Sequence, residues 1–319
     1  MSRKIVVTLY KMSWAGAPSL DALRDAGFDV KINTLDRYWT DEELAVELTD
    51  AYAVIAGGET YAAATLDGAK DLRIIARMGV GYDKIDLDYC RHRGIKVTAA
   101  FGTNHEAVAD FGFSLMLAAA SNIVPHATDM RSRVWKNTQH LDVFGQTIGI
   151  LGLGRIGRAM ARRATGFDMT RLYWDLERKP DAEAEGIAYS SLEALLATSD
   201  YVSIHLPLTP QTQNLLGAAQ LASMKPTAIV INTARGGIVD EAALHDALAN
   251  GRLAGAAFDV FAVEPANASP LLALPNFIGT PHCAPATPGA YRNMTRSCVD
   301  SILAIHAGGM PAKEVVLVG

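Results

Sequence analysis

The sequence predicts an α/β protein with two domains, each built around a mostly parallel sheet. Three observations support this fold class. A length of 319 residues is long for one hydrophobic core, short apolar runs alternate with helical patterns through the N-terminal third, and a glycine-rich turn near the middle joins an apolar run to a helical one. Half of the residues are hydrophobic and a fifth are charged, as is usual for a globular α/β protein.

The N-terminal third alternates between patterns typical of buried strands and patterns typical of helices. The strand patterns cover residues 5–9, 30–32, 54–56, 72–76 and 95–97, and the helical patterns cover residues 19–26, 41–48, 61–70 and 86–92. Thr40 with Glu43, and Thr103 with Glu106, have the spacing of capping boxes and predict that helices begin directly after the two threonines. Such alternation indicates a parallel sheet covered by helices.

The glycine-rich turn lies in the stretch 147–175, TIGILGLGRIGRAMARRATGFDMTRLYWD. Gly152 permits a tight turn, Gly154 lets the backbone approach a pyrophosphate, and Gly157 lets the helix pack closely on the strand. Asp175, about twenty residues on, would accept hydrogen bonds from ribose hydroxyls and repel a 2′-phosphate. The stretch therefore predicts binding of NAD in preference to NADP, and a glycine-rich turn of some other α/β domain is the alternative.

Four further strand patterns follow this stretch, at residues 201–204, 228–231, 256–258 and 277–278, and bring the predicted strands of the second domain to six. Polar or glycine-containing segments follow each of the four, starting at His205, Asn232, Asp259 and Thr280. Ligands of open α/β sheets bind beyond the carboxyl ends of the strands, so these segments are candidates for the site.

The loop Arg77-Met78-Gly79-Val80-Gly81-Tyr82-Asp83 follows a strand pattern of the first domain. Its glycines would expose consecutive backbone N–H groups suited to a small carboxylate, and a turn that needs positive φ at the glycines is the alternative. Residues 10–14, after the first strand, could form a wall of the same cleft. Residues 123–144, with Trp135 among charges, suit either a subunit contact or an ordinary surface arm.

Charge and cysteine content exclude several classes of partner. The net charge is −5 with no long basic run, which argues against nucleic acid or an anionic membrane as the main partner. No apolar stretch is long enough to span a membrane. Cys90, Cys283 and Cys298 have no metal-ligand spacing and form no even set, so we expect no metal site and a reducing, cytoplasmic location.

Seven motifs together resemble the D-isomer-specific 2-hydroxyacid dehydrogenase family, in its short form without a C-terminal regulatory domain. They are GVGYDKIDL at 79–87, NHEAVADF at 104–111, GLGRIG at 152–157, HLPLTPQT at 205–212, NTARGGIVDE at 232–241, AFDVFAVEP at 257–265 and TPH at 280–282. The resemblance implies two Rossmann-like or flavodoxin-like domains, with residues 102–287 binding NAD. Residues 1–101 and 288–319 then form a split substrate domain, and a homodimer is expected.

The resemblance also implies the roles of individual residues. Arg235 would bind the carboxylate and carbonyl oxygen of a small 2-keto acid. His282 would give a proton to the carbonyl, or take one from a D-2-hydroxy acid, and Glu264 would orient its ring and favour its protonated form. Further substrate contacts would come from Arg77, Val80 and Gly81. The implied cofactor contacts are Gly152, Gly154, Arg155, Ile156, Gly157, Asp175, His205, Pro207, Thr212, Thr233, Ala234, Arg235, Asp259 and His282.

Two departures from the family pattern bear on the substrate. His282 is followed by Cys283-Ala284-Pro285 where the family has a glycine-rich segment, and Phe101 precedes Gly102 where the family often has proline. Two other functions are kept as alternatives. One is a phosphite-type dehydrogenase of the same fold, and the other is a non-enzymatic NAD sensor similar to the transcriptional corepressors that share it.

Overall fold

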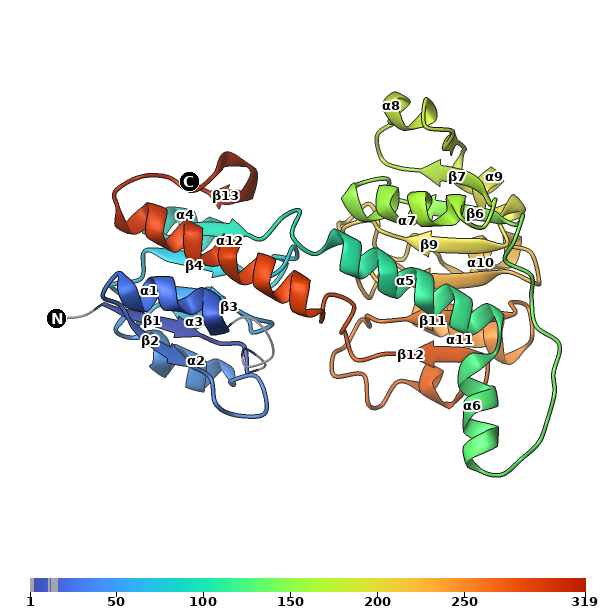
Figure 1. Ribbon diagram of the computed structural model, residues 1–319, viewed down its shortest axis with the longest axis horizontal. Helices are drawn as coiled ribbons and strands as arrows, with labels where there is room; N and C mark the ends of the chain where they lie inside the picture. The colour runs from blue at the N-terminus through green and yellow to red at the C-terminus, as the bar shows by residue number, and fades with distance from the viewer. Residues whose placement is uncertain (1–2, 11, 13–16) are drawn as a thin grey trace. The chain divides into compact units, whose positions relative to one another are not determined.

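The computed structural model describes residues 3–10, 12 and 17–319, and it divides into two compact units (Figure 1). Unit 1 comprises residues Met1–Asn104 and Ala286–Gly319, and unit 2 comprises residues His105–Pro285. The predicted domain boundaries lie after residue 101 and before residue 288. They are three residues earlier and two residues later than the boundaries of these units. Asn104 belongs to unit 1 because its buried side-chain amide donates to the sulfur of Met294, at 3.7 Å.

Unit 1 contains a six-stranded sheet in the order β13-β5-β4-β3-β1-β2. All neighbouring strands are parallel except β13, which pairs antiparallel with β5. The sequence patterns predict no strand at β13, which is three residues long. The strands are β1 (Lys4–Val7), β2 (Asp29–Ile32), β3 (Ala51–Ala56), β4 (Ile74–Arg77), β5 (Lys96–Ala99) and β13 (Val316–Val318).

Helices cover the sheet of unit 1, as expected for parallel strands whose side chains are buried on both faces. The capping box of Thr40 and Glu43 is confirmed at the start of α2. The helix predicted at 61–70 is only the short α3, because Tyr61 pairs with Ile85 in a bridge instead of entering the helix. The helices are α1 (Asp21–Asp25), α2 (Asp41–Leu48), α3 (Ala63–Leu66), α4 (Leu87–Arg93) and α12 (Pro288–His306), with 3-10 turns η2 (Ala17–Leu20) and η4 (Lys313–Val315).

Unit 2 contains a seven-stranded parallel sheet in the order β12-β11-β10-β9-β6-β7-β8. The predicted α/β fold class is confirmed, and the strand order is that of a doubly wound dinucleotide-binding sheet. The prediction of six strands missed β8, because two exposed residues are too short for a pattern. The strands are β6 (Thr147–Leu151), β7 (Thr170–Trp174), β8 (Ala188–Tyr189), β9 (Tyr201–Ile204), β10 (Ile229–Asn232), β11 (Gly255–Phe258) and β12 (Phe277–Gly279).

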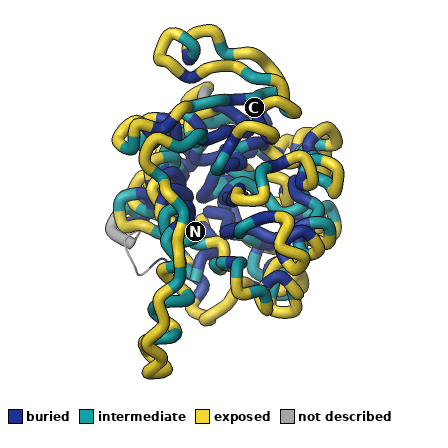
Figure 2. Tube along the Cα trace, turned by 90° about the vertical axis from the view of Figure 1, so that its right-hand side faces the viewer, coloured by how far each residue is buried: buried dark blue, intermediate teal, exposed yellow. Residues whose placement is uncertain are grey.

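The helices of unit 2 enclose this sheet, and Figure 2 shows the buried trace surrounded by exposed segments. The second predicted capping box is wrong: the Thr103 hydroxyl donates to the Ala100 carbonyl, and the Glu106 carboxylate pairs with Arg163 of α7. The helices are α5 (His105–Ala120), α6 (Ile123–Arg131), α7 (Arg155–Thr165), α8 (Pro180–Glu183), α9 (Leu192–Thr198), α10 (Ala218–Ser223) and α11 (Glu241–Ala249), with the 3-10 turn η3 (Pro270–Ala273).

Within the described part of the chain, no single helix has the length and apolar composition to cross a membrane. Helices α5 and α6 meet that criterion only when they are taken together, and they are bent by 65° where they join.

Close packing of α7 on β6 depends on Gly157. A Cβ atom at this position would overlap the carbonyl oxygen of Gly152 and lie 3.2 Å from the Ile150 side chain. The obstacle is backbone, which cannot rotate away as a side chain can. Gly154, three residues earlier, is a natural contrast, because a Cβ atom there would meet nothing within 4 Å.

We therefore expect Gly157→Ala to lower the free energy of unfolding by about 1–3 kcal/mol, the usual cost of forcing extra volume into a packed interior. Gly154→Ser serves as the control, because Gly154 is the N-cap of α7, where serine is favoured, and a Cβ atom has open space there. It should stay within about 0.5 kcal/mol of the wild type. Urea denaturation followed by circular dichroism measures both. Equal stability of the two variants would contradict the packing role of Gly157.

Candidate functional site

The strand order of unit 2 reverses between β6 and β9, and this reversal places a crevice beyond the carboxyl ends of those strands. The glycine turn leads from β6 into α7 at this point, with Gly152 at a φ of +93° that favours glycine. Gly154 is the N-cap of α7 and offers no side-chain cap to the first amides of the helix. Because Gly154 and Arg155 are exposed, the N-terminus of α7 is open to an anion.

Asp175 follows β7 and lies beside the glycine turn. Its Oδ2 accepts a hydrogen bond of 2.7 Å from the amide of Leu153, so it fixes the turn as well as presenting a negative charge there. The first cation after it, Arg178, is held away by Glu183 through two hydrogen bonds of 2.7 and 2.8 Å. The guanidinium also lies over the ring of Tyr189, 5.2 Å from its centroid.

The segment after β9 contains three of the predicted cofactor contacts. His205 lies next to Gly152, and its Nε2 is 2.9 Å from the Ser203 hydroxyl. Burial lowers the pKa of His205 to about 3, so the ring is neutral near pH 7. Thr212 is fully buried, and its hydroxyl donates to the Pro207 carbonyl and accepts from the Thr209 amide. Thr212 therefore shapes the turn that presents Pro207.

The segment after β10 presents Thr233, Ala234 and Arg235. Asn232 holds its shape: the side-chain oxygen accepts from the Ala234 amide at 3.0 Å, and the side-chain nitrogen donates to the Arg235 carbonyl at 2.9 Å. Gly236 comes next, and a Cβ atom there would overlap the backbone of Phe261. This glycine therefore lets the Arg235 segment pack directly against the segment that carries Glu264.

His282 and Glu264 form a pair within unit 2. The Nδ1 atom of His282 is 2.9 Å from Oε2 of Glu264, and both side chains are partly exposed. The other carboxylate oxygen of Glu264 accepts from the Phe261 amide at 3.1 Å. With Nδ1 directed at the carboxylate, the second ring nitrogen of His282, Nε2, is the one available for proton transfer.

Asp259 anchors the segment that carries His282. The carboxylate is 1% exposed, and it accepts hydrogen bonds from the Thr280 hydroxyl at 2.7 Å and from the amides of Cys283 and Ala284 at 2.9 and 2.8 Å. These bonds flank His282, whose backbone has a φ of +50° that a non-glycine residue seldom adopts.

The predicted carboxylate loop of unit 1 is held by Arg77. Its Nε donates to the Gly81 carbonyl at 2.9 Å, and its Nη1 donates to the carbonyls of Met78 and Ala56 at 2.6 and 3.3 Å. The backbone amides of Val80 and Gly81 donate no hydrogen bond to any residue that the structure describes. The geometry thus gives Arg77 a positioning role, with two backbone donors left for an anion.

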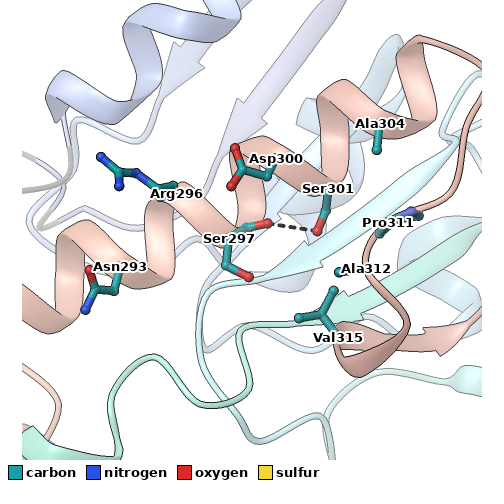
Figure 3. Close-up of a pocket in the computed structure, with 9 residues that line it drawn as sticks. All are labelled: Asn293, Arg296, Ser297, Asp300, Ser301, Ala304, Pro311, Ala312 and Val315. Atoms are coloured by element: carbon teal, nitrogen blue, oxygen red, sulfur yellow. Dashed lines mark hydrogen bonds between the residues drawn. The ribbon is translucent and has the colours of Figure 1, made fainter.

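The wall predicted at residues 10–14 is only partly described, and a hollow on unit 1 lies elsewhere. Of the wall predicted at residues 10–14, Lys11, Ser13 and Trp14 lie outside the described residues. An open hollow of about 270 Å³ lies instead on unit 1 between α12 and residues 311–315 (Figure 3). Helix α12 runs back along β4, with Thr295 contacting Met78 and Cys298 contacting Ala76, so most of the hollow lies beside the sheet and away from its carboxyl edge.

Two of the buried polar atoms that unit 2 leaves unsatisfied suit a bound dinucleotide. Nδ1 of His205 and Oγ1 of Thr233 are buried without a hydrogen-bond partner among the described residues, and both follow central strands of the sheet. Buried polar atoms of this kind need a partner, and a bound ligand supplies one. No group of three or more His, Cys, Asp or Glu side chains in the described ranges is arranged to hold a metal ion.

Sequence reasoning missed three supporting roles in this site. It did not single out Asn232 or Gly236, and it assigned Asp259 to the cofactor without seeing that it anchors the His282 segment. The only signal was position, since Asn232 and Asp259 directly follow strand patterns and Gly236 lies in the segment that Asn232 begins.

The chain is similar to known proteins over most of its length. Residues 113–284 match the family model described as D-isomer specific 2-hydroxyacid dehydrogenase, NAD binding domain. The glyoxylate reductase of Korarchaeum cryptofilum is 44% identical over 261 residues, which cover 79% of each chain. The glyoxylate reductase of Thermococcus gammatolerans is 40% identical over 314 residues, or 94% of each chain. The D-lactate dehydrogenase of Aquifex aeolicus, solved with NAD and lactic acid, superposes with a TM-score of 0.86 at 26% identity and covers 99% of each chain.

Proposed function

The chain belongs to the D-isomer specific 2-hydroxyacid dehydrogenase family, a family of NAD-dependent oxidoreductases, and from this premise we propose that it reduces a small 2-keto acid to the D-2-hydroxy acid with His282 as proton donor. The observation that carries the proposal is the contact of 2.9 Å between His282 and Glu264, at the carboxyl edge of the unit 2 sheet. Glyoxylate is the first substrate to test, because both reductases above are named for it.

His282 and Glu264 perform the proton transfer. Glu264 accepts a hydrogen bond from Nδ1–H of His282 and so fixes the orientation of the ring, while the Phe261 amide holds the carboxylate in place. The Nε2 atom of His282 gives its proton to the carbonyl oxygen as negative charge develops there. In the oxidative direction the same nitrogen takes the proton from the hydroxyl.

Arg235 and the unit 1 loop bind the substrate. The guanidinium of Arg235 offers a planar set of donors for the carboxylate and the carbonyl oxygen of a 2-keto acid. The amides of Val80 and Gly81 supply two further donors for the carboxylate, and Arg77 keeps their loop in shape.

The cofactor is held by unit 2. When NAD binds, the amides at the start of α7 and the side chain of Arg155 would hold the pyrophosphate, and Asp175 would hold the ribose. Further cofactor contacts would come from Ile156, Pro207, His205, Thr233, Ala234 and Asp259. NADH, when bound, supplies the hydride for the carbonyl carbon.

We expect His282→Ala to lower kcat for NADH-dependent reduction of glyoxylate by about 10²–10⁴-fold, the usual contribution of a positioned acid, while NADH still binds. Absorbance loss at the NADH band and NADH fluorescence titration measure the two effects. His245→Ala, which changes a half-buried histidine of α11, is the matched control and should retain activity. The proposal would be overturned if the wild type reduced a panel of 2-keto acids no faster than His282→Ala does.

Asp175 predicts a preference for NADH over NADPH, because its charge would repel a 2′-phosphate and Arg178 is engaged by Glu183. Asp175→Asn keeps an oxygen for the Leu153 amide and removes the charge. We expect this variant to lower the NADH-to-NADPH ratio of kcat/KM by about five- to tenfold, the effect of one unit charge at short range in a wet site. A wild-type enzyme that uses NADPH as well as NADH would contradict this account.

A homodimer through α6 and residues 132–146 is the remaining part of the proposal. This segment runs along the outside of unit 2 and carries exposed apolar side chains (Figure 1). Trp135 is 89% exposed and Phe144 is 68% exposed, and Ile123, Met130 and Val134 are also exposed. A second copy that covered these side chains would remove their apolar surface from water.

Light scattering after size-exclusion chromatography should therefore give twice the chain mass for the wild type. Trp135→Glu should shift the mass toward that of one chain at micromolar concentration, because it places a charge in the proposed interface. Val46→Glu, at an exposed apolar residue of α2, is the control and should leave the mass unchanged. A monomeric wild type, or a Trp135→Glu variant that stays dimeric, would refute this interface.

A further inference from the structure

A buried carboxylate, Glu59, lies at the carboxyl edge of the unit 1 sheet and has no role in the chemistry described above. Glu59 follows β3 in the chain and is only 5% exposed. Oε2 accepts a hydrogen bond of 2.7 Å from the Thr8 hydroxyl, which in turn accepts from the Gly57 amide. Oε1 is buried and has no hydrogen-bond partner among the described residues.

Nearby cations do not satisfy Glu59. Lys84 donates its ammonium to the Gly58 carbonyl at 2.9 Å, and Arg77 donates to the carbonyls of Ala56, Met78 and Gly81. Both cations attract the carboxylate only at longer range, and burial outweighs them and raises the pKa of Glu59. A buried carboxylate with an unsatisfied oxygen is costly to the fold, and a hydrogen bond from a ligand would satisfy it.

The position of Glu59 brings it close to the loop proposed to bind the substrate carboxylate. Strands β3 and β4 are neighbours, with Ala56 paired to Arg77, so the segments that carry Glu59 and Val80 leave the sheet side by side. Arg77 ties the two segments together, because it bonds the Ala56 carbonyl on one and the Gly81 carbonyl on the other.

Aromatic hydroxyl groups surround the same edge. The ring of Tyr38 lies against Gly57 and Gly58 and meets Tyr10 edge-on at 5.1 Å. The Tyr61 hydroxyl is 3.4 Å from that of Thr8. The surroundings are thus rich in neutral polar groups, and they suit a small polar ligand better than an aliphatic one.

We propose that Glu59, positioned by Thr8, is a specificity site for a hydroxyl group on the tail of the substrate, with Oε1 as the acceptor. A neutral donor fits better than an ammonium, because Arg77 and Lys84 already place two positive charges around the carboxylate. This inference rests on the proposed function and deepens it: the preferred substrates are 2-keto acids that carry a hydroxyl beside the carbonyl.

Hydroxypyruvate and pyruvate differ only by such a hydroxyl, so they form the test pair, and glyoxylate, which has no tail, is the baseline. We expect wild-type kcat/KM to be at least about tenfold higher for hydroxypyruvate than for pyruvate, since a site built to bond a hydroxyl rejects the analogue that lacks it. Equal values for the two would overturn the inference, and this measurement needs no variant.

Glu59→Leu should lower the hydroxypyruvate-to-pyruvate ratio of kcat/KM by about tenfold or more. Glu47→Leu is the control, because Glu47 is a carboxylate of unit 1 that lies on α2 and pairs with Lys4 and Lys31 at 3.5 and 2.6 Å. Its hydroxypyruvate-to-pyruvate ratio of kcat/KM should stay that of the wild type. An unchanged ratio in Glu59→Leu would overturn the inference. If that variant does not fold, the wild-type ratio decides.

Failure of the proposed function gives a different result. An enzyme that reduces none of the three acids contradicts the proposed activity itself. An enzyme that reduces glyoxylate through His282, yet treats hydroxypyruvate and pyruvate alike, contradicts only the role of Glu59.

Discussion

The hydrogen bonds of the Asp259 carboxylate are the interaction on which the site depends. One buried carboxylate at the end of β11 binds the Thr280 hydroxyl and the amides of Cys283 and Ala284, on both sides of His282. Charge-assisted hydrogen bonds of this kind are strong, and here they are sheltered from water. They hold the histidine backbone in a conformation that its own preferences would not select, and so place the ring beside Glu264.

The same arrangement recurs at the other strand ends of the molecule. Asn232 shapes the Arg235 segment, Thr212 shapes the turn at Pro207, and Arg77 shapes the Val80–Gly81 loop. In each case a side chain near a strand end satisfies loop backbone groups, which fixes the loop without a surrounding layer of secondary structure. The reactive groups can then remain partly exposed to a substrate while their supports are buried.

The two histidines of unit 2 show how environment separates roles. His205 and His282 both follow strands of one sheet. Burial lowers the pKa of His205 to about 3, whereas His282 is partly exposed and faces a carboxylate. Residue type alone would allow either histidine to transfer a proton, but only His282 has a charged partner and an accessible ring nitrogen.

Local sequence determined the elements whose signal lies within a few neighbouring residues. The G-x-G-x-x-G turn with Asp175, the capping box at Thr40 and most strands could be predicted, because glycine conformation, capping and apolar periodicity act over short distances. The roles of Arg235, Glu264 and His282 could be expected only from the family resemblance, since their separations in the chain carry no geometric information. Tertiary structure alone decided that Glu106 pairs with Arg163 instead of capping a helix, that Gly236 lies against Phe261, and that Glu59 is buried with one oxygen unsatisfied. These outcomes depend on contacts between residues distant in the chain, which packing sets and local patterns do not encode.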